Sequence, residues 1–118
     1  MRYLFLIYLD EAALDRMAPE TYGALVRDSL AYDDYLRERG KYIASDALQS
    51  VRTATTLRMP GDDVLTTDGP FAETKEQLGG FFLVEADNLD EATKLAAKCP
   101  CIRHGSIEVR PVKELVRE

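Results

Sequence analysis

The chain has 118 residues, of which 46% are hydrophobic, and this length and composition are typical of one folded domain. Fifteen basic residues are scattered among twenty-one acidic ones, giving a formal charge of −6. This balance argues against a nucleic-acid partner, because phosphates would be repelled. We therefore expect a single domain over residues 1–118.

The apolar segment YLFLIYL, residues 3–9, predicts a buried strand. It is far shorter than the roughly 20 residues that a membrane span needs. Asp10 and Glu11 follow it without the small-residue cleavage site of a signal peptide. Because the chain also has only two cysteines, we expect a protein of the reducing cytoplasm with no membrane contact.

Residues 19–48 predict a long helix followed by a strand. Pro19 suits the first helical turn, and Gly40 marks the end of the helix. Between them apolar residues recur every three or four positions, which predicts an amphipathic helix with one buried face. The segment KYIASDAL, residues 41–48, follows as a strand. The apolar face of the helix comprises Tyr22, Leu25, Val26, Leu30 and Leu36.

A hairpin and a further strand are predicted next. Two Thr-rich segments flank the turn-forming pair Pro60-Gly61, which predicts a β-hairpin over residues 53–67. The apolar segment GFFLVEA, residues 80–86, predicts a strand. We expect the Gly79-Gly80 pair to form a hinge into this strand, leaving room beside it for another backbone or a ligand.

The carboxyl-terminal third predicts a helix and a last strand. Asn88 is a helix cap with Glu91 at the capping-box position, and Pro100 ends the helix. The segment SIEVRPV, residues 106–112, is the last strand, with its apolar and charged residues on opposite faces. The resulting order is that of the split βαβ, or ferredoxin-like, α+β fold: an antiparallel sheet with both helices on one face and an inserted β-hairpin.

The two apolar strands, residues 3–9 and 80–86, carry large apolar side chains on both faces, as Phe81 and Phe82 illustrate. Helices cover only one face of such a sheet, so a second apolar face would be left in water. The same face of a second copy is the simplest cover, and we therefore expect a homodimer.

Cys99, Cys101 and His104 lie in the segment CPCIRH and are residue types that bind zinc. A zinc site needs a fourth ligand, and the spacing matches none of the usual pairs of ligands. Cys99 also continues the apolar face of the preceding helix. We expect no metal site and no bound cofactor.

The segment TDGPFAETKEQLGGF, residues 67–81, followed by IEVRP, residues 107–111, resembles the signature of the DGPF branch of the YCII-related family. Asp68, Gly69, Pro70 and Phe71 form the motif that gives this branch its name. The likeness extends from MRYLFLIY through TATTLR to GSIEVRPV, which is nearly the whole chain.

This resemblance implies a dimeric α+β barrel with a cleft for small molecules. Proteins with the wider barrel architecture include lactone isomerases, dehydrochlorinases and cofactor-independent oxygenases, and DGPF proteins occur beside, or fused to, extracytoplasmic-function sigma factors. Other branches carry a histidine near the start of the first helix, proposed to pair with an aspartate in the cleft. The corresponding segment MAPETYGAL, residues 17–25, has no histidine. Acid–base chemistry would then fall to Asp68, Glu73, Glu76 or a tyrosine.

The candidate catalytic residues are Asp68, Glu73 and Glu76. Asp68 is either a turn former that accepts the backbone N–H of Phe71 or a general base in the cleft. Glu73 and Glu76 are three residues apart, so on a helical turn their carboxylates would share a face and supply an acid and a base. The alternative for these two is a solvated surface turn.

The candidate substrate-binding residues are Tyr8, Phe71, Lys75 and Arg110. Tyr8 would place a hydroxyl at the cleft edge, and Phe71 would be a cleft wall or a loop anchor. Lys75 would bind an anionic substrate or pair with an acid. Arg110 would bind a carboxylate through two hydrogen bonds, or form a cross-strand ion pair.

Three functions fit these observations. The first is an enzyme without a cofactor that isomerises, eliminates or hydrolyses a small polar or aromatic acid by proton transfer, with Asp68 as its base. The second is a non-catalytic ligand-binding or regulatory dimer linked to a sigma factor. The third is a cofactor-independent oxygenase whose substrate supplies the reducing power.

Overall fold

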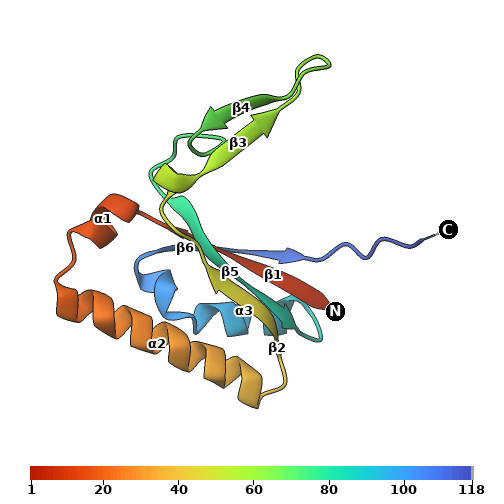
Figure 1. The fold of residues 1–118 in the computed structure, drawn as a ribbon. Coiled ribbons are helices and arrows are strands. Elements are labelled where there is room, and N and C mark those ends of the chain that lie inside the picture. The colour runs from red at the N-terminus through yellow and green to blue at the C-terminus, as the bar shows by residue number, and fades with distance from the viewer. Residues whose placement is uncertain (118) are drawn as a thin grey trace.

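The computed structural model describes residues 1–117, which fold around a four-stranded antiparallel sheet of order β2-β5-β1-β6 with the two long helices on one face (Figure 1). This is the predicted ferredoxin-like α+β arrangement, with the hairpin β3-β4 as a separate two-stranded unit. The strands are β1 (Arg2–Leu9), β2 (Tyr42–Ala47), β3 (Thr55–Arg58), β4 (Leu65–Asp68), β5 (Gln77–Glu85) and β6 (Gly105–Pro111). The helices are α1 (Glu11–Asp15), α2 (Pro19–Glu38) and α3 (Leu89–Ala97), with 3-10 turns η1 (Val51–Thr53) and η2 (Pro100–Arg103).

The core lies between the sheet and the helices. Side chains alternate between the two faces of a strand, so Tyr3, Phe5 and Ile7 of β1 all point to the helices and are buried. Phe82 and Val84 of β5 are buried on the same face. The residues that complete this core are Tyr32, Leu36, Ala86, Ala92, Leu95, Ala96 and Cys99.

The opposite face of the sheet, called the open face below, carries no helix (Figure 1). Leu4 pairs with Leu83 and Leu6 with Phe81 across β1 and β5, and all four side chains are partly exposed. Along β6 the same face is polar. The open face comprises Leu4, Leu6 and Tyr8 of β1, Ala44 and Asp46 of β2, Leu78, Phe81 and Leu83 of β5, and Ser106, Glu108 and Arg110 of β6.

The helix α2 begins at Pro19 and ends just before Gly40, as predicted. The backbone N–H of Gly40 donates to the carbonyl of Arg37, and that of Lys41 donates to Leu36, which satisfies the last carbonyls of the helix. In α3 the Asn88 side chain caps the first turn by accepting from the backbone of Glu91, which confirms the predicted helix start.

Burial of the α2 apolar face was predicted along the whole helix, and this is wrong for most of the residues on that face. Tyr32 and Leu36 are buried, whereas Tyr22, Val26 and Leu30 are 46%, 43% and 64% exposed. One face of the helix, from Tyr22 to Arg37, borders a cavity, so its apolar side chains line that cavity instead of filling the core.

The segment before β5 also differs from expectation. The strand begins at Gln77, so Gly79 and Gly80 lie inside it and form no hinge before it. A Cβ atom on Gly80 would lie 2.8 Å from the carbonyl oxygen of Asp46, so glycine allows close approach of the backbone of β2. Residues 72–76 form bends without a helical turn, and the predicted shared helical face of Glu73 and Glu76 is therefore absent.

The hairpin β3-β4 projects from the sheet as an arm, defined here as residues 54–68 (Figure 1). Its position and its turn match the predicted hairpin. At its base Gly69 adopts a φ of 114°, a conformation that favours glycine. The side chains of Thr56 and Arg58 donate to the carbonyls of Gly69 and Phe71, both at 2.8 Å, and these bonds hold the DGPF loop against the arm.

The buried contact between α2 and α3 gives a first prediction. The hydroxyl of Tyr32 donates to the carbonyl of Leu95 at 2.7 Å, and its ring packs edge-on against Phe82. Tyr32→Phe keeps the ring and removes the hydrogen bond, so it should lower the free energy of unfolding by about 1 kcal/mol in urea denaturation. Tyr35→Phe is the control, because within residues 1–117 the Tyr35 hydroxyl makes no hydrogen bond; it should change stability by less than about 0.5 kcal/mol. Equal effects would contradict the assigned role of Tyr32.

Candidate functional site

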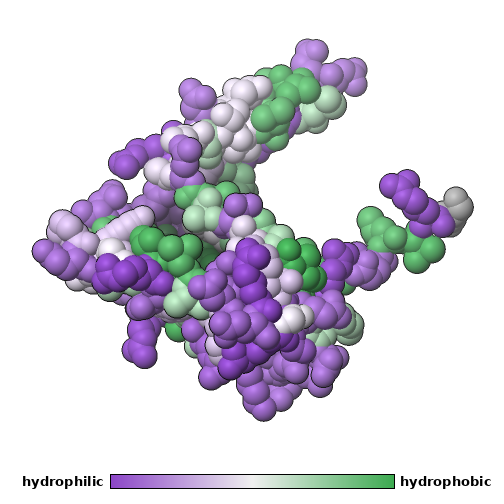
Figure 2. Space-filling view, turned by 60° about the horizontal axis from the view of Figure 1, so that its bottom comes forward, coloured by the Kyte–Doolittle hydropathy of each residue, from purple (hydrophilic) through white to green (hydrophobic). Residues whose placement is uncertain are grey.

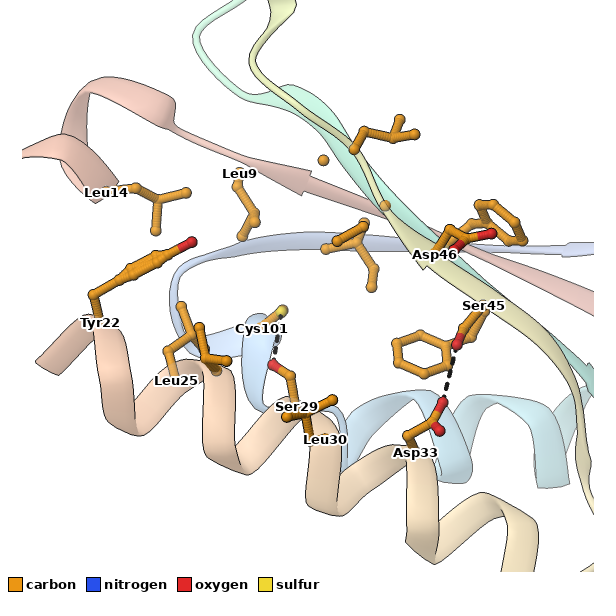
Figure 3. Close-up of a pocket in the computed structure, with 18 of the residues that line it drawn as sticks. Leu9, Leu14, Tyr22, Leu25, Ser29, Leu30, Asp33, Ser45, Asp46 and Cys101 are labelled. Carbon is orange, nitrogen blue, oxygen red and sulfur yellow. Dashed lines mark hydrogen bonds between the residues drawn. The ribbon is translucent and has the colours of Figure 1, made fainter.

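A cavity of about 520 Å³ lies between one face of α2 and the sheet, and it is called the helix-side cavity below (Figure 3). Its walls are mainly apolar. Leu9 and Leu14 border it beside α1, Leu25 and Leu30 border it from α2, and Phe82 borders it from the sheet. Figure 2 shows apolar surface in a hollow near the middle of the molecule. A pocket of this size and character suits a small apolar or aromatic molecule.

Asp33 brings a carboxylate to this cavity from α2 (Figure 3). One carboxylate oxygen accepts from the Ser45 hydroxyl at 2.9 Å, and the other accepts from Nε of Arg37 at 2.8 Å. The Asp33 side chain is only 20% exposed. These contacts from α2 and β2 fix the orientation of the carboxylate.

Tyr42 contacts both of the residues that bind the Asp33 carboxylate, Ser45 and Arg37. The hydroxyls of Tyr42 and Ser45 lie 2.9 Å apart, which connects Asp33 to a tyrosine through one serine. The Arg37 guanidinium lies 3.8 Å from the centre of the Tyr42 ring. The hydrogen bond to Asp33 raises the pKa of Arg37, so this side chain stays positively charged.

Cys101 and Ser29 bring a thiol and a hydroxyl to the same cavity, 3.8 Å apart (Figure 3). A hydrogen bond from the neighbouring Cys99 thiol holds the pKa of Cys101 below that of an ordinary thiol, although burial acts in the opposite direction. Tyr22 lies at the Leu14 end of the cavity with its hydroxyl toward Leu9. The helix-side cavity thus offers three carboxylates, those of Glu11, Asp33 and Asp46, together with one thiol and several hydroxyl groups within mainly apolar walls.

A second cavity, of about 540 Å³, lies between the open face and the base of the arm; it is called the sheet-face cavity below. Tyr8 and Leu78 of the open face line it, together with Thr56 of the arm and Phe71 and Glu76 of the connecting loop. It is therefore bordered by residues far apart in the sequence.

Two sets of polar contacts begin at Tyr8 and Glu76, which line the sheet-face cavity. The Tyr8 hydroxyl donates to Glu108 at 3.3 Å, Arg110 forms an ion pair with Glu108, and the Ser106 hydroxyl donates to Glu76 at 2.7 Å. Partial burial, and then the Glu108 charge, raise the pKa of Tyr8, so its hydroxyl stays protonated. The hydrogen bond from Arg110 holds the pKa of Glu108 below its usual range.

The residues singled out in the sequence fall into two groups. Tyr8, Phe71 and Glu76 come together in the sheet-face cavity, and Arg110 lies beside it through Glu108. The remaining candidates, Asp68, Glu73 and Lys75, are exposed and do not line either cavity.

Asp68 is the last residue of β4 and pairs with Thr55. Within residues 1–117 its carboxylate makes no hydrogen bond, so the expected bond to the N–H of Phe71 is absent. The side chains of Thr56 and Arg58 hold the loop instead, through hydrogen bonds to the backbone carbonyls of residues 69 and 71. Paired residues of antiparallel strands share a face, so Asp68 lies on the same face of the arm as Thr55. Thr56, the next residue of the strand, lies on the opposite face and borders the sheet-face cavity.

Sequence reasoning missed the polar residues of the helix-side cavity, among them Ser29, Asp33, Ser45 and Cys101. A signal for two of them is present. Ser29 and Asp33 continue the spacing of three and four that runs from Tyr22 to Leu36, so they interrupt the apolar face of α2 with polar groups. Ser45 and Cys101 are far from Ser29 and Asp33 in the sequence and come close to them only in the folded chain.

Two structural findings concern other classes of site. Residues 1–117 contain no group of three or more histidine, cysteine, aspartate or glutamate side chains placed to hold a metal ion. In the same part of the chain, no helix is long and apolar enough to cross a membrane.

Comparison with known proteins identifies relatives over almost the whole chain. The sequence profile of the YCII-related domain matches residues 1–116. An uncharacterized protein of Rhizobium meliloti (strain 1021) is 38% identical over 114 residues, covering 95% of this chain and 92% of the relative. Among solved structures, 5-chloro-2-hydroxyhydroquinone dehydrochlorinase of Burkholderia phenoliruptrix AC1100, in complex with 2,5-dihydroxybenzoquinone, is similar with a TM-score of 0.56 and 18% identity, covering 96% of this chain and 94% of that chain.

The lowered pKa of Cys101 predicts its reactivity. A thiolate reacts with iodoacetamide and a thiol does not, so alkylation of Cys101 should reach half its maximal rate at a pH below the value of about 8.5 of a free cysteine. Buried Cys99 should stay unmodified in the folded protein. Cys99→Ala removes the thiol donor and should therefore move the Cys101 midpoint upward. Peptide mass spectrometry after timed alkylation measures both sites, and a Cys101 midpoint at or above that of a free cysteine would contradict the assigned hydrogen bond.

Proposed function

This chain belongs to the YCII-related family, and on that premise we propose that it is a cofactor-independent enzyme that transfers a proton on a small molecule held in the helix-side cavity. The observation that carries this proposal is the fixed carboxylate of Asp33 within apolar walls. Acid–base catalysis needs such a group at a defined position next to the bound molecule. Isomerisation and elimination are the reaction classes that proton transfer of this kind supports.

The contacts of Asp33 define how it would act. A carboxylate has about four lone-pair sites, and Ser45 and Arg37 occupy one on each oxygen. The remaining sites are available to a ligand hydroxyl or to a proton on carbon. Ser45 and Tyr42 then provide a hydroxyl path along which a proton can leave the cavity.

The cavity walls indicate the substrate class. Leucine and phenylalanine side chains suit a planar ring, and Ser29, Cys101 and Tyr22 bring polar groups to the edge of that ring. The structurally similar dehydrochlorinase acts on a chlorinated hydroxyhydroquinone. We therefore propose a small hydroxylated aromatic compound as the substrate class.

A specific observation favours a second candidate, a non-catalytic ligand-binding protein. Both carboxylate oxygens of Asp33 already accept hydrogen bonds, one of them from a charged arginine, which suits a ligand anchor as well as a base. In this case the protein would be a regulatory dimer, and its partner would be the sigma factor expected from the family resemblance.

The sequence motif supports a finer family placement and a second binding region. We propose that the chain belongs to the DGPF branch, because residues 68–71 carry the motif and their loop is held by Thr56 and Arg58. The sheet-face cavity brings together Tyr8, Phe71 and Glu76, which supports ligand binding there as the alternative location.

We also propose that the protein is a homodimer that pairs through the open face. Leu4, Leu6, Phe81 and Leu83 form a contiguous apolar surface without a covering element within residues 1–117. Such a surface is characteristic of an interface between proteins. A second copy presents the same surface, so two copies related by a two-fold axis would bury these apolar faces against each other.

The ligand class is tested by thermal unfolding against a panel of small phenols, hydroxybenzoic acids and lactones. A ligand at one hundred times its dissociation constant adds about 2.7 kcal/mol, which raises the midpoint by roughly 10 °C for a domain of this size. We expect this shift with at least one hydroxylated aromatic compound. A panel without any shift would contradict the proposed substrate class.

The role of Asp33 is tested with the compound that gives the largest shift. Asp33→Asn keeps the side-chain volume and removes the basic carboxylate, so turnover of this compound should fall by at least about 100-fold. Asp28→Asn, on the exposed side of α2, is the matched control and should retain full turnover. Retained binding without turnover in the wild-type protein would favour the non-catalytic candidate. Unchanged turnover in the Asp33 variant would overturn the catalytic assignment.

The same assay separates Asp33 from the candidate chosen from sequence. If Asp68 is the base, Asp68→Asn should abolish turnover while the protein stays folded. Our assignment predicts that the loss follows Asp33 because Asp68 is exposed and lines neither cavity. Loss of turnover in the Asp68 variant alone would show that the catalytic base lies on the arm and not in the helix-side cavity.

A further inference from the structure

Two thiols and a hydroxyl lie together where the turn η2 meets the helix-side cavity (Figure 3). Cys101 lines this cavity, and its sulfur lies 3.8 Å from the hydroxyl oxygen of Ser29 on α2. Cys99, two residues earlier, is buried in the core. The proton transfer proposed for Asp33 gives neither thiol a chemical role.

The turn η2 holds Cys101 in place. Pro100 follows Cys99 directly, and its ring restricts the backbone at the start of the turn. The backbone N–H of Ile102 donates to the carbonyl of Cys99 at 3.1 Å, and that of His104 donates to the carbonyl of Cys101 at 2.9 Å. A backbone fixed on both sides keeps the Cys101 side chain at the wall of the cavity.

The surroundings of Cys101 favour its thiolate form. The hydrogen bond from Cys99 lowers the pKa of Cys101 to about 7; burial opposes this effect, and the contact with Ser29 adds to it. The same hydrogen bond, and then burial, raise the pKa of Cys99, so this thiol keeps its proton and remains the donor. A thiolate is the nucleophilic form of cysteine. Near neutral pH the cavity therefore contains a nucleophile.

The walls beside this nucleophile select a class of electrophile. Leu25, Leu30 and Phe82 border the cavity with apolar surface, which suits a flat, uncharged ring. A quinone is such a ring, and the carbons of its double bonds are electrophilic. It is also the two-electron oxidised form of a dihydroxylated aromatic compound. The walls that suit the substrate class proposed above therefore admit the corresponding quinone as well.

Polar groups on α2 have a spacing that matches the oxygens of such a ring. Ser29 and Asp33 both line the cavity and are four residues apart, so they share one side of the helix and lie about 6 Å apart along its axis. One six-membered ring with oxygens at opposite ends can bridge this distance. The Ser29 hydroxyl, beside the Cys101 sulfur, can bond one oxygen. Asp33 can accept a hydrogen bond from the other oxygen once it is a hydroxyl.

We propose that Cys101 is a covalent capture site for quinones that enter the helix-side cavity. The sulfur adds to a ring carbon, and the electron pair of the ring double bond moves to the conjugated carbonyl oxygen, which takes up the proton that the thiol released. The proton on the carbon that now carries sulfur then leaves, and the other oxygen gains a proton. The product is a hydroquinone thioether of Cys101, and the balance needs no further oxidant or reductant.

This inference rests on the cavity and the ligand class of the proposed function, and it adds a covalent site for the oxidised form of that class. The captured ring occupies the cavity next to Asp33. Capture therefore closes the cavity to further ligand, so that an oxidised aromatic compound would stop the proposed reaction.

Reaction of the full chain with p-benzoquinone at neutral pH, followed by stopped-flow absorbance and peptide mass spectrometry, tests the capture site. We expect one benzoquinone per chain, on Cys101, and a rate that saturates as the quinone concentration rises, because binding in the cavity precedes bond formation. In urea-unfolded protein both cysteines should react, with a rate that rises linearly. Cys101→Ala should remove the adduct from the folded protein.

Two leucines provide a matched test of the cavity. Leu25→Trp fills part of the cavity and should slow capture by about tenfold or more at low quinone concentration, whereas Leu57→Trp, on the exposed arm, should leave the rate unchanged. Circular dichroism checks that both variants are folded. Amide chemical shifts of the ¹⁵N-labelled adduct need no variant, and those of Ser29 and Asp33 should differ from the free protein. An adduct that leaves both shifts unchanged would overturn the inference, because the ring would lie outside the cavity.

The outcomes separate this inference from the proposed function. Saturable capture at Cys101 without turnover of any hydroxylated aromatic compound would leave the capture site standing and overturn the enzyme proposal. Turnover that depends on Asp33, together with a quinone reaction of the folded protein that is linear in concentration or that persists in Cys101→Ala, would overturn the capture site and leave the proposed function standing.

Discussion

The attachment of α2 to the core through only one of its faces is the constraint on which the rest of the site depends. Tyr32 and Leu36 are buried against the sheet, and the hydroxyl of Tyr32 bonds the carbonyl of Leu95 in α3. The neighbouring face of the helix, from Tyr22 to Arg37, borders a cavity between α2 and the strands. Apolar side chains that would normally form a core therefore become the walls of a binding site, with the Asp33 carboxylate among them.

The two faces of the sheet divide the molecule into two functional regions. The helix-side cavity has its polar groups fixed within one chain, since Asp33 is held by Ser45 of β2 and Arg37 of its own helix. The sheet-face cavity is bordered by the open face and the arm, both of which expose apolar side chains. This contrast underlies the separate proposals of chemistry in the first cavity and assembly around the second.

The fold follows from the sequence because its signals are local and repeated. The alternation in β1, the cap at Asn88 and the glycine after α2 each specify one element, and the element order leaves few topologies. The helix-side cavity does not follow from the sequence, because Ser45 and Cys101 meet α2 only after strand pairing and the turn η2 bring them there. The DGPF motif directed attention to the loop that joins the arm to β5. Tyr8 and Glu76 do meet beside that loop, while Asp68 lies on the opposite face of the arm from their cavity.

Occupation of the helix-side cavity by a small molecule is the proposal on which the catalytic assignment of Asp33 rests. Titration of the ¹⁵N-labelled protein with hydroquinone, followed through amide chemical shifts, tests this occupation. We expect saturable changes at Ser29, Asp33, Ser45 and Cys101, with little change at Phe71 and Glu76. Changes confined to Tyr8, Phe71 and Glu76 would place the site in the sheet-face cavity and contradict the claim, as would the absence of any saturable change.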